Sequence, residues 1–152
     1  MNNLCYGQIE IYNQLSDMLI LQQSALKQGK WQHAPRLILS EKAHHQVASL
    51  LVSPASSAGS VCYALADGTR FVIDFSIAAG QQVNQLSCQV QGEHRANYQL
   101  EVCQFGTEQQ SVRLVLCIRA VCDIQSLPNQ LLHSTPFDGT SRVASTNLAA
   151  VA

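Results

Sequence analysis

The sequence is poor in charge and in long apolar runs. Only 12% of its 152 residues are charged and the net charge is −1, which excludes the basic surface of a general nucleic-acid-binding protein. No apolar run approaches the ~18 residues of a membrane-spanning helix. The N-terminus has neither the basic region nor the apolar segment of a secretory signal. We therefore expect a cytoplasmic protein that binds no nucleic acid and has no membrane span.

Short catalytic motifs are also missing. The sequence has no Gly-rich phosphate loop, no His-Glu-x-x-His and no Gly-x-Ser-x-Gly. Its six cysteines include no Cys-x-x-Cys pair, so a metal site is not indicated. We expect no catalytic residues, no metal and no cofactor, and these absences favour a protein that is not an enzyme.

The strongest pattern in the chain is an alternation of apolar and polar residues over residues 60–123. Asp67-Gly68 is a favoured hairpin turn. After it, Phe71, Ile73, Phe75 and Ile77 share one face of a strand, because side chains alternate between the faces. The pattern predicts an antiparallel meander with strands at 60–66, 69–77, 82–91, 96–105 and 111–123.

The last of these strands is apolar on both faces. Val115, Cys117 and Val121 lie on the face opposite its main apolar side, so this second face also needs cover. A helix, a closing sheet or a second subunit would supply that cover. A weakly charged, glutamine-rich surface does not oppose self-association, so we expect a homodimer.

The N-terminal third shows helical spacing. A stripe of apolar residues predicts a helix over 8–29, formed by Tyr12, Leu15, Leu19 and Leu26. Residues 36–39 fit either a short strand or the lead-in to a second helix, for which Ser40 is a suitable N-cap and which would run to about Val52.

These patterns together predict an α+β fold. One or two N-terminal helices pack on a curved five-stranded antiparallel β-meander, which either stays open or closes into a barrel. Residues 1–132 would form a single domain. Residues 133–152 are mostly small and polar without a period, and this composition predicts a flexible C-terminal tail.

Asp74 is the best candidate for a functional residue. It lies in the middle of a predicted strand, with Arg70 four residues before it on the same face, where it would either bind a ligand or pair across strands on the wet face of a sheet. The segment Asp74-Phe75-Ser76-Ile77-Ala78-Ala79-Gly80 resembles the Asp-x-Ser-x-x-Gly signature of PilZ domains. The resemblance implies a small bacterial β-barrel related to cyclic di-GMP binding, with Asp74, Ser76 and Gly80 as ligand-binding residues.

Three functions remain open at this point. The first is a non-catalytic binding or adaptor module that acts through a protein partner. The second is a degenerate PilZ-like sensor of cyclic di-GMP. The third is a small ligand-binding barrel or enzyme that uses Asp74 on another small ligand. The missing catalytic motifs favour the first of these.

Overall fold

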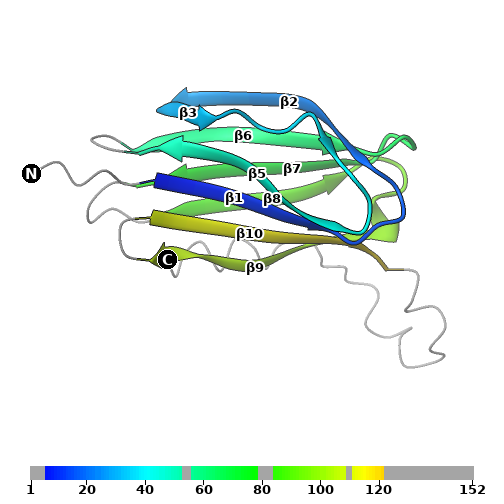
Figure 1. Ribbon diagram of the computed structural model, residues 1–152. Helices are drawn as coiled ribbons and strands as arrows, with labels where there is room; N and C mark the ends of the chain where they lie inside the picture. The colour runs from blue at the N-terminus through cyan, green and yellow to red at the C-terminus, as the bar shows by residue number, and fades with distance from the viewer. Residues whose placement is uncertain (1–5, 53–55, 79–83, 109–110, 122–152) are drawn as a thin grey trace, which may run out of the picture.

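The computed structural model describes residues 6–52, 56–78, 84–108 and 111–121, which form two β-sheets packed face to face (Figure 1). Each sheet has five strands. Sheet A has the order β3 (Lys30–His33), β5 (Ala43–Leu51), β1 (Tyr6–Asn13), β10 (Ser111–Ala120) and β9 (Tyr98–Glu108). Sheet B has the order β4 (Ile38–Leu39), β2 (Leu19–Gln28), β6 (Ser57–Ala64), β7 (Arg70–Ile77) and β8 (Gln85–Gln91).

Sheet A joins the two ends of the described chain. β1 runs parallel to β10, from the pair Tyr6 and Ser111 to the pair Asn13 and Ile118. On its other side β1 is antiparallel to β5. Parallel neighbours need a long connection, and here the connection passes through the whole of sheet B.

The core lies between the sheets and follows the alternation of each strand. Inward residues of β7 and β10 are at most 4% exposed, and they are Phe71, Ile73, Phe75, Ile77, Val112, Leu114, Leu116 and Ile118. β1 adds Ile9 and Ile11, which are fully buried. The predicted apolar face of residues 69–77 is therefore confirmed as part of the main core.

The predicted helix over 8–29 is wrong, because this segment forms β1, a loop and β2. Ile9 and Ile11 point into the core, whereas Gln8 and Tyr12 are exposed on the other face. The buried side chains of this segment therefore repeat every two residues, as in a strand, rather than every 3.6 residues, as in a helix. The apparent helical stripe combined an exposed residue of β1 with residues of the following loop and strand.

The second predicted helix is also wrong, since residues 43–51 form β5. Its backbone pairs with β1 and β3, and this tertiary pairing overrides a local helical pattern. Ser40 lies in the turn before the strand rather than at a helix N-terminus. Residues 36–39 contain the short strand β4, which was one of the two alternatives.

The predicted single meander is wrong in its connectivity. Strands form in all five places, but β6, β7 and β8 belong to sheet B, while β9 and β10 belong to sheet A. Between β8 and β9 the chain crosses from sheet B to sheet A at the single-turn 3₁₀ helix η1 (Arg95–Asn97). The described fold is consequently an all-β sandwich with open edges, and neither α+β nor a closed barrel.

Two of the three residues in the apolar strip that was expected to need a partner are already covered, and the third, Val121, is half-buried. Val115 and Cys117 are each only 5% exposed. Val115 lies between Glu10 and Gln104 in the register of the neighbouring strands, whose side chains flank it. This strip therefore gives no support to a dimer. The predicted domain boundary at residue 132 lies outside the described residues.

Within the described residues, no helix has the length and apolar character required to cross a membrane.

Candidate functional site

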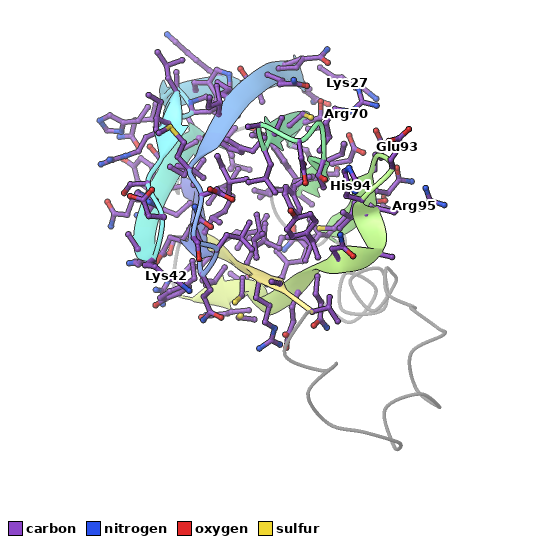
Figure 2. The ribbon with its side chains drawn as sticks, turned by 90° about the vertical axis from the view of Figure 1, so that its right-hand side faces the viewer. Lys27, Lys42, Arg70, Glu93, His94 and Arg95 are labelled. Carbon is purple, nitrogen blue, oxygen red and sulfur yellow. The ribbon has the colours of Figure 1, made fainter. Side chains whose placement is uncertain are left out.

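The described residues among those singled out from the sequence share the outer face of sheet B. Arg70 and Asp74 are exposed on β7 and Ser76 is half-buried on the same face, while Gly80 lies outside the described residues. Asp74 is flanked across the strands by Ser60 and Ser87. Figure 2 shows the Arg70 side chain at the surface.

This face is polar, with a half-buried thiol near its centre. Cys62 lies opposite Val72 on the neighbouring strand. Burial raises the pKa of the Cys62 thiol, which the positive charge of Arg70 opposes and the negative charge of Asp74 reinforces. A thiol with a raised pKa is a poor nucleophile. In the described part of the chain no ion pair joins Arg70 to Asp74, so the two charges stay open to solvent.

An ion pair with a buried carboxylate lies on the outer face of sheet A. Glu10 of β1 is 3% exposed, and its carboxylate accepts hydrogen bonds from Arg113 Nε at 2.6 Å and Nη2 at 3.0 Å. His44 Nε2 lies 2.8 Å from the same carboxylate, and the His44 ring stacks on Tyr12 at 4.3 Å. Hydrogen bonding from Arg113 lowers the pKa of Glu10, against the effect of burial and with help from His44.

This cluster links three strands of sheet A. Glu10 comes from β1, Arg113 from β10 and His44 from β5. Bidentate arginine pairs are strong and geometrically specific. Because the Glu10 carboxylate already has three close donors or partners, it is occupied in holding the strands in register, and we assign it a structural role.

Exposed apolar side chains gather at the edge of sheet B where β4 pairs with the start of β2. Ile20 and Ile38 are direct cross-strand neighbours and are 48% and 54% exposed. Met18 and Leu37 lie within two residues of this pair and are 46% and 71% exposed. We call these four residues the apolar patch. An exposed group of large apolar residues marks an interaction site more often than single ones do.

A fully buried amide holds the backbone beneath the apolar patch. Asn13 is 0% exposed, and its Nδ2 lies within 3.2 Å of the carbonyl oxygens of Asp17, Leu39 and Ser40. Its Oδ1 accepts the backbone N–H of Leu15 at 3.0 Å. One side chain thus ties the loop that carries Met18 to the end of β4.

A second buried group fixes the other side of the patch. The Tyr63 hydroxyl donates to the carbonyl oxygen of Arg36 at 2.6 Å, and the Tyr63 side chain is fully buried. The backbone N–H of Leu21 donates to the carbonyl of Leu37 at 2.8 Å. The exposed side chains of the patch therefore stand on a backbone that is anchored on both sides.

Sequence reasoning missed both the Glu10 cluster and the apolar patch. Met18 lies within the segment predicted as a helix over 8–29, and residues 36–39 fit either a strand or the lead-in to a helix. The usable signal was that Met18 and Ile20 interrupt the alternation with a continuous run, Met-Leu-Ile-Leu. Nothing local could have joined Glu10 to Arg113, which is 103 residues away.

Comparison with known proteins identifies the fold but not a family. No protein-family model matches the chain, and no curated protein matches it. Among solved structures, the lipid binding protein Nakanori superposes with a TM-score of 0.57 at 12% identity, over 75% of this chain and 70% of that one. At such identity the likeness shows a shared fold alone.

A lectin from Xerocomus chrysenteron is a more distant structural match. The wild-type structure gives a TM-score of 0.45 at 8% identity, over 75% of this chain and 99% of the lectin. A mutated form of the same lectin gives the same TM-score and identity, over 98% of the lectin chain.

Proposed function

We propose that this protein is a binding module that attaches reversibly to lipid surfaces through the apolar patch. The observation that carries the proposal is the cluster of Met18, Ile20, Leu37 and Ile38, each at least 46% exposed and close together on an anchored backbone. A sandwich fold shared with a lipid binding protein is a precedent for it. The fold alone would not suffice, because one fold serves many functions.

The size of the patch fits shallow insertion. Complete burial of a Leu, Ile or Met side chain contributes ~1.5–3 kcal/mol. On average roughly half of the patch is already covered, with Leu37 the most exposed at 71%, so the four side chains would contribute ~4 kcal/mol on entering a lipid surface. That corresponds to a dissociation constant on the order of 1 mM lipid. A stable protein interface usually involves ~20–30 residues a side, far more than four.

The charges beside the patch are balanced. Arg36 and Lys42 are exposed near it, as are Asp17 and Glu41. Two positive and two negative side chains give no net attraction to an anionic surface, which needs a basic cluster. Binding should therefore depend on apolar contact, and salt should affect it little.

Vesicle cosedimentation tests the proposal. The protein should bind phosphatidylcholine vesicles at millimolar lipid, and the double variant Leu37→Glu/Ile38→Glu should weaken binding at least tenfold. A matched control, Gln8→Glu/Gln99→Glu, adds the same charge at exposed positions of β1 and β9 and should bind like the wild type.

Two results would contradict the proposal. One is a wild-type protein that does not bind phosphatidylcholine vesicles, and the other is unchanged binding by the patch variant. Either result would favour the function predicted from the sequence, an adaptor that acts through a protein partner. The same patch would then be one part of a larger interface.

A further inference from the structure

The two sheets end in four edge strands, and β8 differs from the other three. Edge strands are usually protected by short length, charge or bulges. β4 has two residues, and β3 has four with a shift of register against β5. β9 carries Glu101 and has a shift of register against β10.

Within the described residues, β8 has none of these protections. It contains seven residues, Gln-Leu-Ser-Cys-Gln-Val-Gln, without a charge, a proline or a glycine. It pairs with β7 without any shift of register, and it is the last strand of sheet B. Such a regular, uncharged edge is a template for the addition of another strand.

The sequence of β8 is complementary to itself when it is read in the opposite direction. With Cys88 at the centre, Leu86 would face the partner's Val90, and Ser87 would face the partner's Gln89. Gln85 would face the partner's Gln91. Every apolar residue thus meets an apolar one and every polar residue meets a polar one, which is what an isologous two-fold contact requires.

We propose that two copies of this chain associate through antiparallel pairing of their β8 strands. The pairing joins the two copies of sheet B into one continuous sheet. Glutamine side chains can both donate and accept hydrogen bonds, so Gln85 and the partner's Gln91 can bond across the new contact. Like charges placed directly opposite each other destabilise a sheet, and β8 brings none.

The ends of the strand are compatible with this arrangement. Glu93, His94 and Arg95 lie together in the turn after β8 (Figure 2). In the antiparallel register centred on Cys88, Gln91 already meets the partner's Gln85, so residues 93–95 lie beyond the partner's β8 and bring no charge opposite it. The turn itself combines an acidic and a basic residue, so it carries no strong field of one sign.

Sedimentation equilibrium on the full chain tests the proposal. We expect a dimer at ~100 μM protein, with a dissociation constant of ~10 μM or lower. The double variant Ser87→Lys/Gln89→Lys places lysines directly opposite lysines and should raise that constant at least tenfold. Both positions are exposed, so the fold should persist, which circular dichroism would verify.

The control is Gln8→Lys/Gln46→Lys, which makes the same charge change on the outer face of sheet A and should dimerise like the wild type. A second measurement fixes the register. When Ser87→Cys and Gln89→Cys proteins are mixed and mildly oxidised, peptide mass spectrometry should find a disulfide between positions 87 and 89.

A monomer at ~100 μM overturns the proposal, because the expected constant lies well below that concentration. A dimer that the β8 variant does not weaken, or that gives no link between positions 87 and 89, also overturns it by placing the contact elsewhere.

Discussion

Replacing Asn13 should destabilise the fold and the apolar patch together. Asn13→Ala removes the amide that meets the carbonyls of Asp17, Leu39 and Ser40, and it also removes the acceptor for Leu15 N–H. The hydrogen bonds to Leu15 and Leu39 are fully buried, so water cannot replace them there. Each buried group left unsatisfied costs ~1–3 kcal/mol, which predicts a loss of ~2–4 kcal/mol in the free energy of unfolding.

A near-isosteric change separates hydrogen bonding from packing. Asn13→Asp keeps the acceptor for Leu15 but turns a carboxylate towards the three carbonyl oxygens. An unpaired buried charge costs ~3–5 kcal/mol, so this variant should be less stable than Asn13→Ala at pH 7. Its native carboxyl should have a raised pKa, and the variant should regain stability as the pH falls towards the ordinary range of aspartate near ~4.

Urea denaturation supplies the measurement. Trp31 is the only tryptophan in the sequence, and it contacts Phe75 of the core edge-to-face at 6.3 Å, so its fluorescence reports unfolding. Asn97→Ala, at an exposed position of η1, should change the stability by less than ~0.5 kcal/mol. A loss below ~1 kcal/mol in Asn13→Ala, or no pH dependence specific to Asn13→Asp, would refute the assigned role.

Three further predictions concern other residues. Arg113 lowers the pKa of Glu10 below its ordinary 4.5, so this pair stabilises the fold above about pH 4.5 and the stabilisation is lost as the pH falls through the native pKa. Glu10→Gln should therefore lower the free energy of unfolding at pH 7 and make that free energy depend less on pH in the acid range. Tyr63→Phe should lower the free energy of unfolding by ~1–2 kcal/mol, because it leaves the Arg36 carbonyl without its buried donor. The PilZ resemblance predicts that cyclic di-GMP binds and that Asp74→Ala weakens binding about tenfold or more by calorimetry; heats no larger than those of dilution would contradict it.

The strands of the second half could be predicted because their alternation is complete. In β7, four large apolar residues face inward without interruption, and a hairpin glycine precedes them, with Gly68 at φ 93°. Their division between two sheets could not be predicted. It depends on whether β8 pairs next with β9 or ends its sheet, and both choices bury the same inward residues.

Strand β1 was missed because a polar residue, Asn13, interrupts its apolar inward face. Glu10 is buried on the outer face and Asn13 on the inner face, so β1 shows only two strongly apolar inward positions. Both polar residues are tolerated through partners that are distant in sequence, since Arg113 lies 103 residues from Glu10 and Leu39 lies 26 residues from Asn13. A local pattern carries no trace of such partners.

Together the apolar patch and the β8 contact predict that the dimer binds one lipid surface through two patches. The patch lies at the end of the sandwich where β2 begins, which is also the end where β8 finishes (Figure 1). Antiparallel pairing of β8 puts the two patches at opposite ends of the strands. It keeps the outer faces of the two copies of sheet B on the same side, and Ile20 and Ile38 project from these faces because their neighbours Leu19 and Leu39 lie in the core. Two linked patches on one surface bind more tightly than one, so the wild-type dimer should bind phosphatidylcholine vesicles about tenfold or more tighter than Ser87→Lys/Gln89→Lys, which retains lipid binding as a monomer. Equal binding by both proteins, at concentrations where the wild type is a dimer, would show that the two patches do not act on the same surface.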